Sequence, residues 1–307
     1  MEKPLQNQVA LVAGATRGAG RAIAIELARA GAFVYATGRS SRKEGPSEMD
    51  RPETIEETEE LIRSAGGQGL AVRTDHLEPE QVQSLIQQID DRHHRLDILV
   101  NDIFGGDRYA EFDKRIWEHD LSGGLRMLRM GIDTHLITLH YALPFLLRAE
   151  KGIVIEMTDG PAEANAEFRQ NVGFYYDLVK TNVGRIVKGL AHELADSFVT
   201  PLGVTPGWLR SEAMLQGFGV TEQTWQDACR TLPGFAISES PTYVARGIAK
   251  LVADPEVSRF SGIIVTAGQL AQLYQVTDTD GSQPDCWALI AKHGWNCEDA
   301  TLIQKYR

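Results

Sequence analysis

The sequence predicts an α/β protein with a doubly wound, parallel sheet of about seven strands and helices on both faces of the sheet. Segments rich in Val, Ile and Leu alternate along the chain with amphipathic segments, and no internal repeat or low-complexity linker divides them. Most of the apolar runs are continuous rather than alternating, which is typical of strands that are covered on both faces. A single domain is therefore the simplest interpretation.

The strands are expected where the apolar runs are rich in β-branched residues. They are predicted at residues 8–13, 32–37, 69–74, 97–101, 152–158, 197–205 and 263–266. Amphipathic periodicity predicts helices at residues 21–30, 54–65, 79–92, 131–147, 175–196 and 241–253. Pro79 and Pro241 stand where the first turn of a helix tolerates proline.

Three internal segments do not follow this alternation, namely residues 39–52, 105–130 and 207–234. Long irregular segments in a compact fold often carry function, so the second and third are expected to be substrate loops. We expect residues 1–268 to form the Rossmann-type domain that includes these loops. Residues 269–307 are expected to form a C-terminal extension that packs on this domain or on a neighbouring subunit.

Composition excludes several classes of function. The chain has 307 residues, of which 43% are hydrophobic and 24% charged, as in an ordinary globular enzyme. Its net charge of −11 argues against a nucleic-acid partner, since phosphate backbones are bound mainly by clustered Lys and Arg. No apolar run approaches the ~20 residues that cross a bilayer, and the first residues lack the apolar region of a signal peptide, so no membrane partner and a cytoplasmic location are expected.

The cysteines predict neither a disulfide framework nor a metal site. Cys229, Cys286 and Cys297 are an odd and sparse set without metal-ligand spacing. We therefore expect no metal.

The first strand is followed by a glycine-rich turn, Gly14-x-x-x-Gly18-x-Gly20, and then by a helix. Glycines let the backbone turn tightly and approach a ligand, while a helix N-terminus presents free N–H groups to an anion. The next strand closes a βαβ unit of the length that a dinucleotide-binding fold requires. This pattern predicts a site for a phosphorylated dinucleotide.

Four landmarks together resemble the short-chain dehydrogenase/reductase family over nearly the full chain. They are the glycine turn, the strand end Leu99-Val100-Asn101-Asp102, the pair Tyr176-x-x-x-Lys180, and Pro206-Gly207 after the sixth strand. Within the family, the segment order, Asp75-His76 and the long tail resemble the branch of dehydrogenase/reductase SDR-family member 1. The resemblance implies a hydride-transferring oxidoreductase that forms a homodimer or homotetramer.

Tyr176 and Lys180 are the candidate catalytic pair. Residues four apart project from the same face of a helix, so the ammonium of Lys180 is expected to lower the pKa of Tyr176. Tyr176 would then exchange a proton with the substrate oxygen, and the resemblance implies that Lys180 also binds the nicotinamide ribose. Tyr175 is excluded because its partner in this register is Val179. The alternative is that Tyr176 is a packing aromatic and Lys180 a solvated charge.

The sequence departs from the family where a serine usually ends the fifth strand. Thr158 and Asp159 stand there instead. Either Thr158 supplies the hydroxyl, or Asp159 accepts a hydrogen bond from a hydroxyl or cationic group of the substrate, since a carboxylate cannot donate. Asp159 could also simply cap the turn that follows. The family also has an asparagine in its fourth helix, and Gly131 stands at that position here. The asparagine usually helps to hold a water for proton relay, so this water needs another partner.

Arginines predict that the cofactor is NADP(H). The second strand ends in Thr37-Gly38-Arg39-Ser40 without the acidic residue that binds the ribose of NAD, and Arg17 lies inside the glycine turn. Guanidinium groups suit a 2′-phosphate, although Arg39 could also be a solvated loop charge. With the resemblance added, the predicted cofactor-binding set is Gly14, Thr16, Arg17, Gly18, Gly20, Arg39, Asp75, His76, Asn101, Tyr176, Lys180, Pro206 and Gly207.

Two functions follow as hypotheses. The first is an NADP(H)-dependent oxidoreductase that interconverts a carbonyl and a secondary alcohol on a small or medium organic molecule. The second is a nucleotide-binding protein with impaired catalysis, a sensor or scaffold, which Asp159 and Gly131 favour. A cofactor-free lyase on the same fold is disfavoured because the glycine turn is intact.

Overall fold

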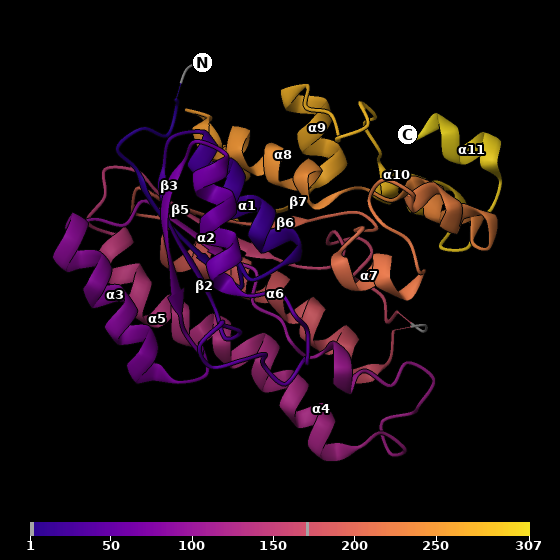
Figure 1. The fold of residues 1–307 in the computed structure, drawn as a ribbon, viewed down its shortest axis with the longest axis horizontal. Helices are drawn as coiled ribbons and strands as arrows, with labels where there is room; N and C mark the ends of the chain where they lie inside the picture. Colours follow the sequence, from indigo (N-terminus) through magenta and orange to yellow (C-terminus); the bar gives the residue numbers. More distant parts are fainter. Residues whose placement is uncertain (1–2, 170–171) are drawn as a thin grey trace.

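The computed structural model describes residues 3–169 and 172–307 and confirms the predicted fold class. One parallel sheet of seven strands has the order β3-β2-β1-β4-β5-β6-β7. The strands are β1 (Val9–Ala13), β2 (Phe33–Gly38), β3 (Gln68–Arg73), β4 (Ile98–Asn101), β5 (Gly152–Met157), β6 (Val199–Thr205) and β7 (Ile264–Thr266), drawn in Figure 1. The order reverses between β1 and β4, where doubly wound sheets open a crevice at their carboxyl edge.

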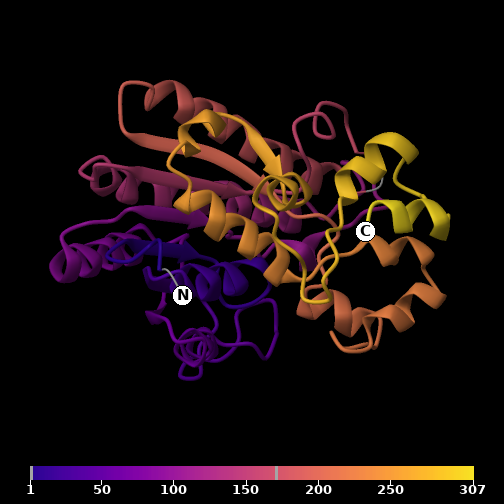
Figure 2. The ribbon, with the colours of Figure 1, turned by 90° about the horizontal axis from the view of Figure 1, so that it is seen from above.

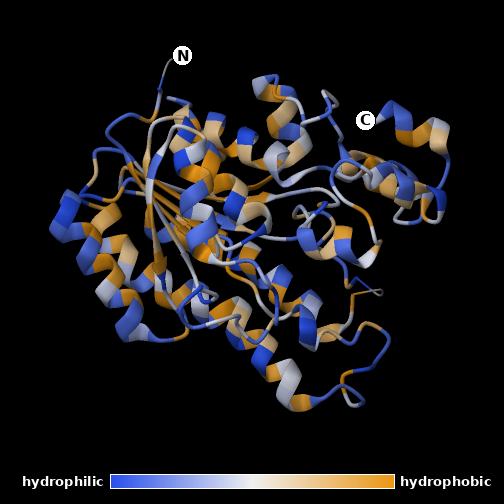
Figure 3. Ribbon diagram, in the orientation of Figure 1, coloured by the Kyte–Doolittle hydropathy of each residue, from blue (hydrophilic) through white to orange (hydrophobic). Residues whose placement is uncertain are grey.

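Helices cover both faces of this sheet. One face carries α1 (Gly18–Arg29), α2 (Ile55–Ser64), α8 (Pro241–Ala253) and α9 (Ala267–Tyr274), and the other carries α3 (Pro79–His93), α5 (Thr134–Leu146) and α6 (Phe174–Glu193). Alternate residues of β1 supply the two cores, because Ala10 and Val12 face α1 while Val9 and Leu11 face α3 and α5. Figure 2 shows the layers from above, and Figure 3 shows the apolar strands between them. No helix in the described ranges has the length and apolar character needed to cross a membrane.

A helix that the sequence analysis did not predict precedes α5. The structure has α4 (Leu121–Leu128) inside the segment expected to be irregular, and a π turn (Arg129–Asp133) joins it to α5. Asp120 caps α4 by accepting hydrogen bonds from the backbone N–H groups of Ser122 and Gly123. Gly124 looks like a helix breaker but is needed for packing, since a Cβ there would lie 2.5 Å from the ring of Tyr175.

The segment 207–234 forms a lid beside the carboxyl edge of the sheet. It contains α7 (Glu212–Gly217), a 3₁₀ turn (Trp225–Arg230) and the start of a second 3₁₀ turn (Pro233–Ile237). The tail crosses this lid with α10 (Cys286–His293) and α11 (Ala300–Lys305), visible at the right of Figure 1. The indole N–H of Trp287 donates to the carbonyl oxygen of Pro206 at 2.7 Å, so the tail also contacts the end of β6.

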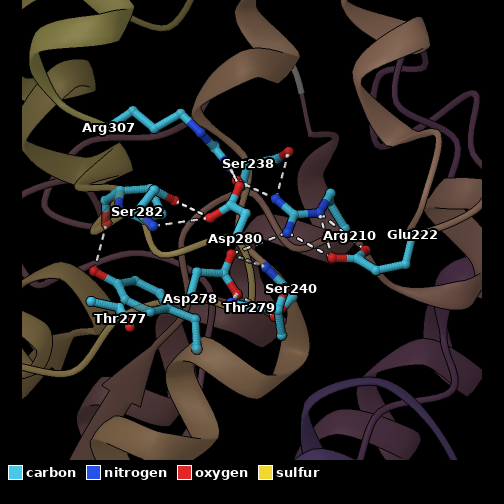
Figure 4. A network of polar contacts seen from close by, with 12 residues as sticks. Arg210, Glu222, Ser238, Ser240, Thr277, Asp278, Thr279, Asp280, Ser282 and Arg307 are labelled. Atoms are coloured by element: carbon cyan, nitrogen blue, oxygen red, sulfur yellow. Dashed lines mark hydrogen bonds and ion pairs between the residues drawn. The ribbon is translucent and has the colours of Figure 1, made fainter.

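Buried charges join the lid to the tail, as Figure 4 shows. Arg210 of the lid is 1% exposed and pairs with Asp278 of the tail at 3.0 Å and with Glu222 at 2.8 Å. Its guanidinium lies 4.4 Å from the ring centre of Trp225, and the guanidinium of Arg307 lies 4.5 Å from the same ring. Lid and tail therefore share one polar and aromatic core.

Arg210→Met should lower the free energy of unfolding by about 3–5 kcal/mol, because it leaves the buried Asp278 carboxylate without its cation. Urea denaturation followed by tryptophan fluorescence measures this. Arg230→Met is the matched control on the same lid, since Arg230 is 82% exposed and its ion pair with Asp227 is solvated. Equal midpoints for the two variants would contradict a structural role for the Arg210 network.

Candidate functional site

A cleft of about 1030 Å³ opens at the carboxyl edge of the sheet, between the glycine turn, the lid and the tail. It is bordered by the two strand ends at which the strand order reverses. Most of the residues predicted from the sequence line it, namely Gly14, Thr16, Arg17, Gly18, Arg39, Asp75, His76, Thr158, Asp159, Tyr176, Lys180, Pro206 and Gly207. Residues far apart in the chain are thus brought together as expected.

Asn101, which is expected to line the cofactor channel, is not among the residues that line this cleft. Its side chain is fully buried and donates from Nδ2 to Oε1 of Glu156 at 2.7 Å. Successive side chains of a pleated strand point to opposite faces of the sheet, and Asn101 is the last residue of β4. Its side chain therefore packs between the sheet and the helices and does not point out of the carboxyl edge. The next residue, Asp102, lines the cleft instead.

The glycine turn brings the end of β1 against the end of β4. Gly14 has φ +88°, and a Cβ at this position would lie 2.2 Å from the carbonyl oxygen of Asp102. A Cβ on Gly20 would lie 2.4 Å from the carbonyl oxygen of Gly14. Gly20 does not line the cleft, but it lets α1 start close to the strand end. Both positions therefore require glycine for close backbone contact.

The N-terminus of α1 binds a carboxylate in the structure. The backbone N–H of Gly18 donates to both oxygens of Glu212, at 2.9 and 3.2 Å, and Nη1 of Arg21 lies 3.9 Å from the same carboxylate. Glu212 is the first residue of α7 in the lid. Its carboxylate takes the position that a helix N-terminus offers to an anion, so this site fits a phosphate group.

Arginine side chains form ion pairs with carboxylates near the end of β2. Arg39 pairs through Nη1 with Glu48 at 3.0 Å, and Arg126 of α4 pairs with the same carboxylate at 3.1 Å. Burial would raise the pKa of Glu48, but the hydrogen bonds from Arg126 and Arg39 hold it below its usual value. Arg17 and Arg51 also line this part of the cleft. Glu48 therefore orients Arg39 and Arg126, whereas Arg51 pairs with Glu53.

Asp75 and His76 follow β3 at the same end of the cleft. His76 is held between two hydroxyl groups, with Nε2 2.8 Å from Oγ1 of Thr37 and Nδ1 2.7 Å from Oγ1 of Thr138. Burial lowers the pKa of His76 to about 3, so the ring is neutral. Asp75 accepts from the backbone N–H of Leu77 and fixes the start of the loop.

Tyr176 and Lys180 project from the first turns of α6 into the opposite end of the cleft. The Nζ of Lys180 lies 3.8 Å above the ring centre of Phe104 and 5.5 Å from that of Tyr176. Burial, and then the neighbouring Asp159 carboxylate, raise the pKa of Tyr176 well above its usual value. This direction is opposite to the expected lowering, because burial and the Asp159 carboxylate both disfavour the charged phenolate.

Asp159, rather than Thr158, faces Tyr176. The Oη of Tyr176 donates to Oδ2 of Asp159 at 3.5 Å, whereas the hydroxyl of Thr158 donates to the carbonyl oxygen of Lys180 at 2.8 Å. Arg169 approaches the same Oδ2 at 3.2 Å and also contacts Asp177 at 3.3 Å.

Sequence reasoning missed Arg169, Glu212 and the buried Glu156. Only Glu156 gave a signal, because an acidic residue in a strand covered on both faces requires a partner. Gly131 lies in the π turn, where a Cβ would lie 2.2 Å from Cγ1 of Val179. The position expected to carry an asparagine therefore has no room for a side chain unless the side chain of Val179 is displaced.

Aromatic and aliphatic side chains from the lid and the tail form the outer wall of the cleft. The lid contributes Trp208, Met214 and Phe218. The tail contributes Trp287, Leu289, Ile290 and Trp295. Such a wall suits the apolar body of an organic molecule.

Comparison with known proteins decides the family. A family model described as Enoyl-(Acyl carrier protein) reductase matches residues 14–262. Dehydrogenase/reductase SDR family member 1 of Mus musculus is 30% identical over 286 residues, which cover 92% of this chain and 86% of that protein. The chain belongs to the short-chain dehydrogenase/reductase family. The resemblance to this branch is confirmed as well, because the Homo sapiens protein of the same name is 28% identical over 92% of this chain and 86% of that protein.

Solved structures of short-chain dehydrogenases share this fold. A dehydrogenase from Xanthomonas campestris has a TM-score of 0.71 and 24% identity, over 92% of this chain and 94% of that one. A short-chain dehydrogenase from Shigella flexneri, complexed with NADP, has a TM-score of 0.68 and 20% identity, over 87% of this chain and 99% of that one.

Short-chain dehydrogenases/reductases use a nicotinamide cofactor, and the cleft fits one. The glycine turn leaves no room for a Cβ beside the strand ends, and the N-terminus of α1 already binds the carboxylate of Glu212. These two observations match a dinucleotide whose diphosphate lies over α1.

Glu212→Gln should lower the dissociation constant for the dinucleotide about fivefold, because it removes a negative charge that competes for Gly18 and repels the diphosphate. Titration of intrinsic fluorescence with NADPH and with NADH measures this. Asp227→Asn removes the same charge elsewhere on the lid and should leave the constant unchanged. Unchanged or weaker binding by the glutamine variant would show that Glu212 does not compete with the cofactor.

Proposed function

We propose that the protein is an NADP(H)-dependent oxidoreductase that interconverts a carbonyl and a secondary alcohol on a small or medium substrate with an apolar body. The observation that carries this is the phenol of Tyr176. It lines the cleft with Lys180 one helical turn away and is hydrogen-bonded to Asp159. An apolar outer wall lies nearby.

The nicotinamide supplies or accepts the hydride when bound, and the chain moves the proton. Because the pKa of Tyr176 is raised, its phenol is protonated at neutral pH and can donate to a carbonyl oxygen during reduction. Lys180 provides the positive charge that the phenolate needs after donation. Asp159 is an acceptor, so it orients a hydroxyl proton and cannot serve as an oxyanion donor.

Arg39 and Arg17 support NADP(H) over NAD(H). No acidic side chain ends β2, and both guanidinium groups line the cleft beside it. Glu48 pairs with Nη1 of Arg39 at 3.0 Å and so orients its side chain. The pair partly neutralises the guanidinium charge, but the other N–H groups of Arg39 can still donate to a phosphate. The NADP complex of the Shigella flexneri relative supports the same choice.

Two relatives support chemistry at a carbon that bears oxygen. A 7alpha-hydroxysteroid dehydrogenase of Clostridium sardiniense is 26% identical over 70% of this chain. A 3-oxoacyl-[acyl-carrier-protein] reductase of Aquifex aeolicus is 29% identical over 69% of it. A cytoplasmic location and a homodimer or homotetramer belong to the same proposal.

Tyr176→Phe should abolish turnover, by at least about 100-fold, because the proton donor is lost while the ring and its packing remain. NADPH oxidation against a panel of ketones, quinones and aldehydes measures this, and fluorescence titration checks that NADPH binding persists. Tyr175→Phe is the matched control, since that phenol does not line the cleft. Activity that survives in Tyr176→Phe would refute the proton-transfer role.

The second candidate is a nucleotide-binding sensor or scaffold with impaired catalysis. Asp159 favours it, because a carboxylate stands where the family has a hydroxyl donor. Normal NADPH binding without turnover on the whole panel at micromolar enzyme would support this candidate and exclude the oxidoreductase.

Arg39→Asp should lower the ratio of kcat/KM for NADPH to that for NADH by about 10- to 100-fold, because a charge-assisted contact to the 2′-phosphate is replaced by repulsion. Steady-state kinetics with both cofactors measure this ratio. Arg63→Asp, an exposed position on α2 with the same change in charge, should leave it unchanged. An unaltered ratio in Arg39→Asp would rule out its role in cofactor choice.

A further inference from the structure

A histidine and a glutamate form a buried pair behind the cleft, between α5 and β5. Nδ1 of His135 lies 2.5 Å from Oε2 of Glu156, and the two side chains are 2% and 0% exposed. Asn101 donates to the other oxygen of Glu156 at 2.7 Å. None of these three side chains lines the cleft, and the proposed reaction has so far given them no role.

Both ring nitrogens of His135 face acceptors. Nδ1 faces the Glu156 carboxylate, and Nε2 lies 3.0 Å from the carbonyl oxygen of Ile103. A neutral imidazole has only one N–H and would leave one of these contacts without a proton, whereas the imidazolium satisfies both. Burial alone would lower the pKa of His135, but Glu156 raises it above its usual value. The geometry therefore favours an imidazolium–carboxylate pair.

A small cavity of about 20 Å³ connects this pair to the catalytic lysine. Its wall includes His135, Lys180, Asp102 and Gly131. The volume is enough for one water molecule, and the polar groups in the wall supply hydrogen-bond partners for it. Asp102, Phe104 and Lys180 line both this cavity and the main cleft, so the two spaces share a wall.

We propose that His135, held as an imidazolium by Glu156, is the proton reservoir that recharges Tyr176 through Lys180 and a water in this cavity. The proposal rests on the proposed carbonyl reduction. It assigns to a histidine on α5 the relay position that Gly131, without a side chain, cannot fill.

The protons of one reductive turnover balance as follows from donor to acceptor. The carbonyl carbon gains a hydride from the cofactor, and the carbonyl oxygen gains a proton from Oη of Tyr176. The phenolate takes a proton from the Lys180 side, the water returns one to Lys180, and Nε2 of His135 gives one to the water. His135 then faces the Ile103 carbonyl oxygen without a proton, which is unfavourable. It regains one from solvent by the reverse route, through Lys180, which lines the cleft, and the water in the small cavity.

Other charged groups around His135 set the pH range of this reservoir. Lys180 on α6 and His76 after β3 surround it, but the ring of His76 is neutral because burial lowers its pKa to about 3. Asp102 directly follows β4, and partial burial raises its pKa to about 6. Glu156 is thus the group that most directly keeps His135 charged, and Asp102 is the competing proton donor in the same cavity.

The experiment uses Glu156→Gln, which keeps the shape of the side chain and an acceptor for Nδ1 but removes the charge. For a group whose pKa is raised in the folded protein, the protonated state persists at low pH and is lost as pH rises. In the variant the reductive kcat should therefore fall at a lower pH than in the wild type. We expect a loss of about tenfold at pH 8 and less than about twofold at pH 6, per NADPH-binding site.

A second readout does not depend on turnover. In full-length protein labelled with ¹⁵N-histidine, both ring nitrogens of His135 should carry protons at pH 7 in the wild type and not in Glu156→Gln, with His135→Asn used to assign the signals. A neutral His135 in the wild type overturns the proposal whether or not the enzyme turns over.

The two readouts separate the possible failures. A uniform loss of kcat at every pH, with lower thermal stability, would make the pair structural and overturn the relay. A shifted profile in Asp102→Asn but not in Glu156→Gln would assign the reservoir to Asp102 instead. Absent turnover with a protonated His135 would refute the proposed reduction, and with it the relay, while leaving the charged pair established.

Discussion

The close backbone contact between the ends of β1 and β4 is the constraint on which the site depends. Gly14 and Gly20 allow it, because a Cβ at either position would overlap a carbonyl oxygen. The contact fixes where α1 begins, and hence where its free N–H groups point. It also brings Asp102 to the cleft wall beside Lys180. The same turn therefore positions both the cofactor cleft and the proposed proton-transfer site.

Several cationic groups in and beside the cleft are paired with carboxylates of other residues. Arg39 is held by Glu48, and Arg169 is held between Asp159 and Asp177. The N-terminus of α1 is held by Glu212 of the lid. These pairs orient the donors and limit the cost of burying charge, but each carboxylate also competes with an incoming anion. The net charge of −11 is thus compatible with a cleft that binds phosphate.

The sheet could be predicted from sequence because continuous apolar runs report burial on both faces, and the observed strands begin and end within a few residues of the predicted ones. Helix α4 could not be predicted, since Gly124 disrupts its pattern and is explained only by the ring of Tyr175. The environment of Tyr176 was missed for a similar reason. Arg169 and Asp159 meet only in the folded chain, so no local spacing in the sequence indicates that they pair. Glu156 was detectable in principle, because an acidic residue in a buried strand requires a polar partner such as His135.

The replacement of a hydroxyl by Asp159 changes which substrate oxygen the site prefers. A secondary alcohol can donate its proton to Asp159 and accept a hydrogen bond from the protonated Tyr176, so both groups are satisfied. A carbonyl oxygen can accept from Tyr176 but meets only lone pairs on Asp159, whose Oδ2 also accepts from Arg169. The ground-state binding of the alcohol is therefore favoured over that of the carbonyl. Under the proposed function, reduction then depends on the protonated Tyr176 and on a proton supply behind Lys180, which is the role that the His135–Glu156 pair would fill.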